Sequence, residues 1–173
     1  MFVVFRASRE MMGVVAEIIR SNAHLYRDIV ENEHDWSEHM VDDDWAERNF
    51  KIREFYLARD GSGRAAEYVA TGSYQNLGDF AYVGYFYVRH GLHGRGYGRA
   101  LMRFLEARAL ADGLTDLRLF CNSRSDWAMR FYEKIGFKEC TRDKGEIFNI
   151  GGGILRPFYE EGSILMKKSV GTR

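Results

Sequence analysis

The sequence predicts a single α/β domain of the α+β type. Strand-like apolar runs and helix-like apolar spacings follow one another along the chain. Turn-forming glycines connect consecutive strand-like runs between residues 55 and 88. The chain has 173 residues with 46% hydrophobic side chains, which is enough to bury one hydrophobic core. It has one proline and no repeated or low-complexity segment, so no linker is evident. We therefore expect one domain over residues 1–173.

The first part of the chain is predicted to form a strand, a helix and an acidic segment. Residues 2–5 suit a short strand, and Ser8 is a candidate N-cap for the next helix. The apolar positions of that helix keep helical spacing: Met11, Met12, Val14, Val15, Ile18 and Ile19. Residues 28–47 are rich in Asp and Glu, contain no Lys or Arg, and include His34, His39, Trp36 and Trp45. Such a run is either a solvated helix face or a surface for a cationic ligand, and composition leaves both open.

The middle of the chain is predicted to form an antiparallel meander. Residues 55–58 and 67–74 flank a glycine turn at residues 60–63, and residues 80–88 follow a second turn at residues 76–79. Strands joined by such short turns pair with their neighbours in sequence.

The second half is predicted to alternate helices and strands. Its segments are a helix from Tyr97 to about Asp112 ended by Gly113, a strand over residues 117–121, a helix over residues 127–135 ended by Gly136, and a strand from residue 137 to residue 140. The tail suggests two more strands within residues 144–166, around an irregular connection that contains residues 151–153. A hairpin or flap suits those glycines better than a second phosphate loop.

A glycine-rich loop at residues 90–101 is the strongest candidate for a binding site. Gly94, Gly96 and Gly98 alternate where the third strand of the meander gives way to a helix. Glycines let backbone N–H groups approach a ligand closely, and a helix N-terminus adds unpaired donors and the positive end of a dipole. The loop is therefore suited to an anion.

The charges around this loop support an anionic ligand. Residues 80–105 contain no Asp or Glu, and the arginine and histidine side chains there are Arg89, His90, His93, Arg95, Arg99 and Arg103. A helix start normally favours acids over cations. Guanidinium groups beside N–H donors suit a pyrophosphate with a further phosphate.

Two well-known phosphate motifs do not fit the loop. The dinucleotide fingerprint G-x-G-x-x-G fails because its third glycine position holds Arg99 when counted from Gly94 and Leu101 when counted from Gly96. The P-loop of nucleotide triphosphatases fails because Gly98 is followed by Arg99 and Ala100 instead of Lys and Ser or Thr.

Composition excludes several other classes. A formal net charge of zero argues against nucleic-acid and anionic-membrane partners. No apolar run reaches the roughly 20 residues that span a bilayer, and residues 1–5 do not form a signal peptide, so we expect a cytoplasmic protein. Cys121 and Cys140 lie outside metal-ligand spacings and are expected to be buried free thiols.

Two motifs together resemble the GNAT superfamily of acyl-CoA-dependent N-acyltransferases. Val88 ends a strand, and residues 93–98, His-Gly-Arg-Gly-Tyr-Gly, occupy the signature [Gln/Arg]-x-x-Gly-x-[Gly/Ala] of that superfamily. Asn122, Ala128 and residues 131–137, Phe-Tyr-Glu-Lys-Ile-Gly-Phe, resemble its second motif in order and spacing. The resemblance covers roughly residues 80–140, and His93 stands where Gln or Arg is usual.

The resemblance implies a fold, a co-substrate and a set of binding residues. The fold would be a central, mixed, mostly antiparallel sheet flanked by helices, and the co-substrate would be acetyl-CoA with no metal ion. Backbone N–H groups of residues 93–99 would hold the CoA pyrophosphate, and the end of the preceding strand would pair with the pantetheine arm. The implied cofactor-binding residues are Val88, His93, Gly94, Arg95, Gly96, Tyr97, Gly98, Arg99 and Asn122.

The resemblance also implies a mechanism. An amine attacks the thioester directly, an N–H group near Val88 polarises the carbonyl, and Tyr132 protonates the departing thiolate. A phenol with a pKa near 10 is protonated at neutral pH and can donate. The alternative for Tyr132 is aromatic packing beside Phe131 and Ile135, and for Asn122 it is a plain turn residue. The general base stays open among Glu17, Glu33, His34, Glu67, Asp79 and water held by Tyr82, Tyr85 or Tyr87.

The acidic segment suggests which amine is accepted. GNAT proteins commonly build the acceptor pocket after the first helix, and residues 28–47 would attract a small cationic amine, with Tyr26, Trp36 or Trp45 available for cation–π contact. Two alternatives are a non-catalytic acyl-CoA-binding or sensing module and a protein or peptide N-acetyltransferase. A homodimer is expected from the resemblance alone.

Overall fold

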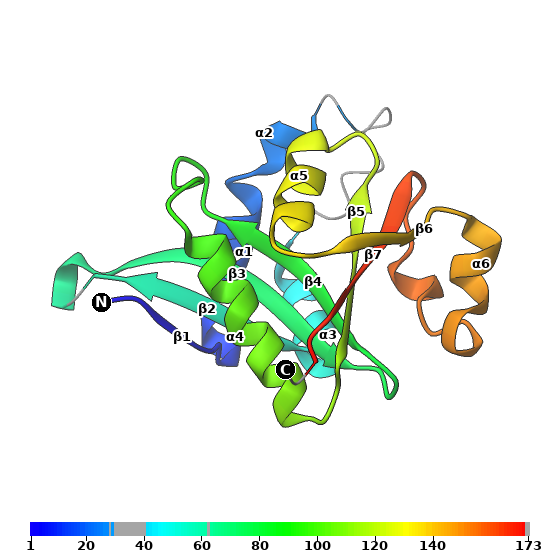
Figure 1. The fold of residues 1–173 in the computed structure, drawn as a ribbon. Coiled ribbons are helices and arrows are strands. Elements are labelled where there is room, and N and C mark those ends of the chain that lie inside the picture. The colour runs from blue at the N-terminus through cyan, green and yellow to red at the C-terminus, as the bar shows by residue number, and fades with distance from the viewer. Residues whose placement is uncertain (28, 30–40, 62, 172–173) are drawn as a thin grey trace. The chain divides into compact units, whose positions relative to one another are not determined.

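The computed structural model describes residues 1–27, 29, 41–61 and 63–171 (Figure 1). Glu33, His34, Trp36 and His39 lie outside the described residues, so the predictions that concern them stay predictions. None of the helices within the described residues is both long enough and apolar enough to cross a membrane.

The described strands form one mixed sheet in the order β1-β2-β3-β4-β5-β7-β6. The strands are β1 (Val3–Arg6), β2 (Glu54–Asp60), β3 (Glu67–Asn76), β4 (Ala81–Val88), β5 (Asp116–Asn122), β6 (Lys138–Thr141) and β7 (Ser163–Ser169). The pairs β1–β2, β2–β3, β5–β7 and β6–β7 are antiparallel, whereas β4 and β5 are parallel. The predicted mixed, mostly antiparallel sheet is therefore confirmed.

The helices alternate with these strands along the chain. They are α1 (Met12–Arg20), α2 (Ala23–Tyr26), α3 (Asp43–Ile52), α4 (Tyr97–Ala111), α5 (Asp126–Lys134) and α6 (Lys144–Asn149). Short 3₁₀ turns cover Arg9–Met11, Gly63–Ala65, Ile150–Gly152 and Arg156–Phe158. Gly113 and Gly136 follow α4 and α5 with φ values of 76° and 99°, which confirms them as the residues that end those helices.

The chain divides into two compact units. The first contains Met1–Gln75 and Gly84–Leu105, and the second contains Asn76–Val83 and Glu106–Arg173. The boundaries fall inside β3, β4 and α4, so a strand or a helix continues through each of them.

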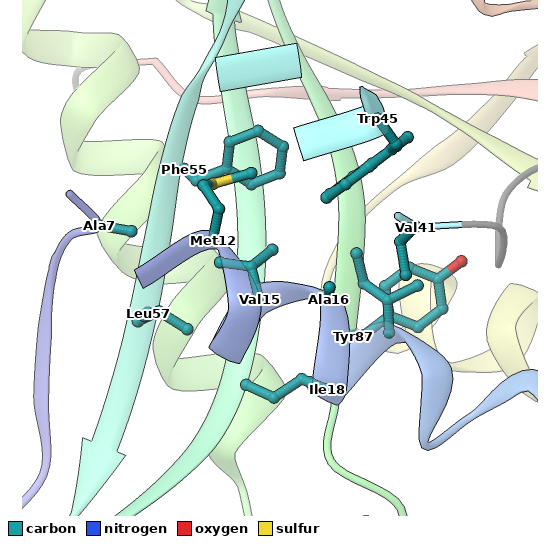
Figure 2. Close-up of a cluster of buried hydrophobic side chains, with 11 residues drawn as sticks. Ala7, Met12, Val15, Ala16, Ile18, Val41, Trp45, Phe55, Leu57 and Tyr87 are labelled. Carbon is teal, nitrogen blue, oxygen red and sulfur yellow. The ribbon is translucent and has the colours of Figure 1, made fainter. Parts of the chain in front are cut away.

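The core of the first unit packs α1 and α3 on the strands. Val15 and Ile18 of α1 are completely buried, which confirms the helical spacing read from the sequence. Figure 2 shows Met12, Val15 and Trp45 gathered beside Phe55. The Trp45 ring lies 5.6 Å from Phe55, measured between ring centroids, so α3 is fixed on β2 by an aromatic contact.

The second unit has its own apolar cluster. The buried members are Phe80, Tyr82, Ile147, Leu155 and Leu165. The Tyr82 ring stacks on Phe158 with centroids 4.6 Å apart. The segment between β6 and β7 therefore contributes directly to this core.

Three predictions about local structure were wrong in detail. Residues 144–149 form the helix α6 and not a strand, because the Asp143 side chain caps it by accepting from the Glu146 N–H at 2.8 Å. Ser8 precedes a 3₁₀ turn and donates its hydroxyl to Glu10 at 2.7 Å, so it makes no side-chain cap. Cys121 is buried, but Cys140 is exposed on the short strand β6.

Candidate functional site

The loop between β4 and α4, residues 89–96, has a backbone that is open to a ligand. Gly91, Gly94 and Gly96 have φ values of 82°, 79° and 88°, in the left-handed region that favours glycine. A Cβ placed at any of the three would meet no atom within 4 Å. Residues 93–96 are also exposed.

The start of α4 supplies further donors beside this loop. The Ala100 N–H donates to the Gly96 carbonyl at 3.0 Å, which is the helical pattern. Amides in the first turn of a helix have no acceptor inside that helix, so those of Tyr97, Gly98 and Arg99 are suited to an anion. Arg95 and Arg99 are exposed at the same place, and α4 has no acid in its first turn. The geometry and charge predicted for this loop are present.

Tyr97 uses its side chain for packing and for a hydrogen bond within the protein. Its hydroxyl donates to Asp60 Oδ2 at 2.8 Å, and its ring stacks on Phe2 at 5.8 Å between centroids. The hydrogen bond to Asp60 raises the pKa of the phenol, with smaller contributions from burial and from the Asp60 charge. The group that Tyr97 can offer to a cofactor is therefore its backbone amide.

Asn22 fixes the end of β4, a role that no local pattern in the sequence predicts. The side chain is 1% exposed, and its Nδ2 donates to the carbonyls of Val88 and Ile18, both at 3.0 Å. In sequence Asn22 reads only as a polar residue after a helix. Its burial and its distant partner become visible only when α1 lies on the sheet.

His93 lies in the loop beside two other histidines. Its ring is 6.0 Å from that of His90, measured between centroids, and the His90 ring is 4.2 Å from that of His24. Partial burial lowers the pKa of His93, the neighbouring His90 and, more weakly, His24 act in the same direction, and the nearby Val88 backbone opposes them. The residue remains in contact with solvent. Its contact with the cofactor stays a prediction.

Two further contacts join the beginning of the loop to α1. The His90 N–H donates to the Ser21 hydroxyl at 3.1 Å. Arg89 donates to Glu17 at 2.7 Å and to the Tyr68 carbonyl at 2.8 Å. Glu17, one of the candidate bases, is therefore engaged in an ion pair.

Asn122 lies in the second unit, at the end of β5, and forms a turn. Its Oδ1 accepts from the Arg124 N–H at 2.8 Å, a local hydrogen bond typical of Asx turns. This hydrogen bond supports the interpretation of Asn122 as a turn residue. Its side chain is partly exposed, so a contact with pantetheine stays a prediction.

Tyr132 also lies in the second unit, on α5. It is 9% exposed, and its ring lies 5.3 Å from Phe131 and 5.8 Å from Phe137 between centroids. The Phe137 N–H donates to the Tyr132 carbonyl at 3.0 Å. Tyr132 therefore packs against aromatic side chains, as the alternative interpretation expects. Its role as a general acid remains a prediction.

The predicted site residues fall into two groups. Val88 and residues 93–99 belong to the first unit, whereas Asn122 and Tyr132 belong to the second. Tyr85 of β4, one of the residues that could hold a water acting as base, has a φ of 44°, which is unusual for a residue other than glycine.

Comparisons with known proteins agree with this fold. The acetyltransferase (GNAT) family profile matches residues 19–137. Among curated protein sequences none matches the chain. The fold is similar to that of a GNAT acetyltransferase from Staphylococcus aureus Mu50, with a TM-score of 0.73, 14% identity, and 99% of this chain and 100% of that chain covered.

Two other solved structures show the same fold. The PaiA N-acetyltransferase of Thermoplasma acidophilum, in complex with coenzyme A, has a TM-score of 0.71 and 13% identity, with 98% of this chain and 99% of that chain covered. The ribosomal-protein-S18-alanine N-acetyltransferase of Escherichia coli has a TM-score of 0.66 and 20% identity, with 100% of this chain and 96% of that chain covered. The family profile spans more than half of the sequence, and the chain belongs to the GNAT family of acetyltransferases.

Proposed function

We propose that this protein is an acetyl-CoA-dependent N-acetyltransferase that acetylates the primary amine of a small, cationic acceptor. The observation that carries the proposal is the open, glycine-rich backbone at residues 91–96 directly before α4. Left-handed glycines, first-turn amides and exposed arginines together suit the pyrophosphate of CoA.

Different groups of this loop have different roles in binding CoA. The backbone amides of Gly94, Gly96 and Gly98 face the pyrophosphate, and the guanidinium groups of Arg95 and Arg99 neutralise its charge. A strand N–H group near Val88 polarises the thioester carbonyl, where negative charge develops during attack. Asn122 contacts the pantetheine arm. These assignments rest on the motifs and on the local geometry of each unit.

The chemistry is a direct transfer. The amine nitrogen forms a bond to the acetyl carbon, and the bond from that carbon to the CoA sulfur breaks. The Tyr132 phenol gives its proton to the departing thiolate, and the amine loses a proton to a base or a water chain. The balance leaves an amide and free CoA thiol.

The acceptor is proposed to be cationic because of the acids at the start of α3. Asp43 and Asp44 are exposed, and Asp42 before them caps the helix. A polyamine, an amino sugar or a lysine-like amine would be attracted to this end of the segment.

A thiol-release screen tests the proposed function. Purified protein is mixed with acetyl-CoA and with representatives of each amine class, and free CoA is followed over time. We expect release with a cationic amine and none without an acceptor. CoA binding without release for any amine would favour an acyl-CoA-binding module, and release only with a peptide N-terminus would favour a protein acetyltransferase.

A further inference from the structure

The hydroxyl of Tyr97 connects the first residue of α4 to the last residue of β2. It donates to Asp60 Oδ2 at 2.8 Å, across 37 positions of the sequence. A hydrogen bond to an ionised carboxylate is about twice as strong as one between neutral groups. The start of α4 is therefore held by a directional contact from the sheet.

The Asp60 carboxylate is itself fixed in place. Its Oδ1 accepts from the Gly61 N–H at 2.8 Å and lies 3.4 Å from the backbone nitrogen of Met1. The hydrogen bonds from Tyr97 and then from Gly61 lower the pKa of Asp60, so the group is ionised at neutral pH. Both carboxylate oxygens have partners, which limits the rotation of the side chain.

The Tyr97 ring is held from the side of β1. It stacks on the Phe2 ring with centroids 5.8 Å apart and planes inclined by 17°. Phe2 directly precedes β1, in which Val3 pairs with Arg59, the neighbour of Asp60. The ring contact and the hydroxyl contact therefore come from the same end of two paired strands. Together they fix both the ring and the hydroxyl of Tyr97.

A fixed Tyr97 matters because the loop before it is built on glycine. Gly94 and Gly96 open the backbone to a ligand, but glycine loses more conformational freedom on ordering than any other residue. A loop that becomes ordered only when CoA binds would bind it less tightly, whereas a loop held in advance avoids that entropic loss. The amides of Tyr97 and of the residues that follow it belong to the first turn of α4, so the Tyr97 side chain controls where they point.

We propose that Asp60 is a positioning residue for acetyl-CoA, which acts through the Tyr97 hydroxyl to hold the start of α4 in the conformation that binds the pyrophosphate. The proposal rests on the proposed function, since it takes residues 93–99 to be the CoA site. It adds a residue of β2, outside both sequence motifs, to those that determine the affinity for the co-substrate.

The charge of Asp60 gives the test a definite sign. A carboxylate that acted only through its charge would repel the anionic co-substrate, and Asp60→Ala would then bind CoA more tightly. If Asp60 positions Tyr97, the same variant binds CoA more weakly. We expect the Kd for CoA, measured by calorimetry, to rise about tenfold in Asp60→Ala and in Tyr97→Phe, as for the loss of one hydrogen bond to a charged group. An unchanged or lower Kd in Asp60→Ala would overturn the proposal.

The double variant Asp60→Ala, Tyr97→Phe shows whether the two residues act as one unit. Each substitution removes the same hydrogen bond, so the double variant should bind CoA about as weakly as either single variant. Independent effects would multiply to about a hundredfold and would contradict the proposal. Because Asp60 acts on binding and not on the reacting atoms, Asp60→Ala should raise the KM for acetyl-CoA and leave kcat unchanged. A loss confined to kcat would also contradict it.

Tyr56→Phe is the matched control. The Tyr56 hydroxyl donates to Glu54 Oε2 at 2.6 Å, so the control removes the same kind of hydrogen bond, on the same strand as Asp60. Phenylalanine keeps the ring contact with Phe104 of α4, whose centroid lies 5.1 Å away. We expect a wild-type Kd for CoA in this variant, with unfolding temperatures measured for all variants. Equal weakening in Tyr56→Phe and Tyr97→Phe would mean a general effect of stability and would overturn the proposal.

The backbone order of the free wild type gives a test that needs no variant. Amide order parameters from NMR relaxation are about 0.85 for a rigid backbone and below about 0.6 for a flexible one. We expect rigid values for Gly94 and Gly96 without CoA, and lower values in Tyr97→Phe. Flexible values in the free wild type would overturn this inference while leaving CoA binding intact. Failure of the wild type to bind CoA at all would instead overturn the proposed function and this inference with it.

Discussion

The side-chain amide of Asn22 donates to the Val88 carbonyl at 3.0 Å and so connects the end of α1 to the end of β4. The same amide donates to the Ile18 carbonyl inside α1. One buried side chain therefore fixes both the helix and the strand that leads into the proposed CoA loop.

Replacing Asn22 with alanine should affect both folding and CoA binding. One buried and one part-buried carbonyl lose a donor, which is expected to lower the free energy of unfolding by about 1–3 kcal/mol. The loop start should also be less ordered, so the Kd for CoA should rise. Asn49→Ala is the matched control, because Asn49 is also buried and donates within its own helix, to the Trp45 carbonyl at 3.0 Å. Chemical denaturation and calorimetry should show a stability loss in both variants and weaker CoA binding in Asn22→Ala alone.

Gly96→Ala should weaken CoA binding through the backbone. Gly96 has a φ of 88° with open space beside its Cα, so the side chain meets no atom but the conformation costs about 1–2 kcal/mol. Gly78→Ala is a close control, since Gly78 has the same φ of 88° and the same open space in the turn before β4. Both variants should lose similar stability. An equal effect of both on the Kd for CoA would argue against the loop as the cradle.

Tyr132→Phe tests the proposed general acid. Phenylalanine keeps the ring contacts with Phe131 and Phe137, so the variant should stay folded, and its unfolding temperature is measured together with kcat. Loss of a general acid typically lowers the rate about a hundredfold or more, and kcat should fall while the Kd for CoA stays the same. Tyr159→Phe, in the aromatic cluster of the second unit, serves as the control. Unchanged kcat would leave packing as the role of Tyr132.

The acids at the start of α3 are best tested without touching Asp42. The Asp42 side chain accepts from the Trp45 N–H at 2.8 Å, so its loss would cost about 1 kcal/mol as a missing helix cap. In the double variant Asp43→Asn, Asp44→Asn the KM for a cationic acceptor should rise, and its dependence on salt should become weaker. Glu139→Gln, on exposed β6, removes a carboxylate of the second unit as the control. An unchanged KM and salt dependence would remove the case for a cationic acceptor.

Much of the fold could be read from the sequence because local patterns decide it. Alternating glycines after an apolar run predicted both the loop and the start of α4, since left-handed backbone and helix capping are local properties. The exception at residues 144–149 has a physical cause. Its apolar residues resemble a strand, but the Asp143 cap and the burial of Ile147 against Leu165 favour a helix.

The site was less predictable, because its features depend on residues that meet only after folding. Asn22 lies 66 positions before Val88, and nothing local marks it as buried. The left-handed φ of Tyr85 likewise arises inside a run of strand-forming residues, at a position that is not itself a glycine. The turn at Asn122 and the packing of Tyr132 show that a motif residue can also have a structural role.

The positions of the unit boundaries bear on how the protein can be divided. Because the chain passes between the units inside β3, β4 and α4, no surface loop marks a place to cut. A fragment ending at Gln75 or Leu105 would break a hydrogen-bonded element and leave it incomplete. We therefore expect the whole chain to melt in a single calorimetric transition, and we expect separately expressed halves to be insoluble unless they are produced together and reassemble.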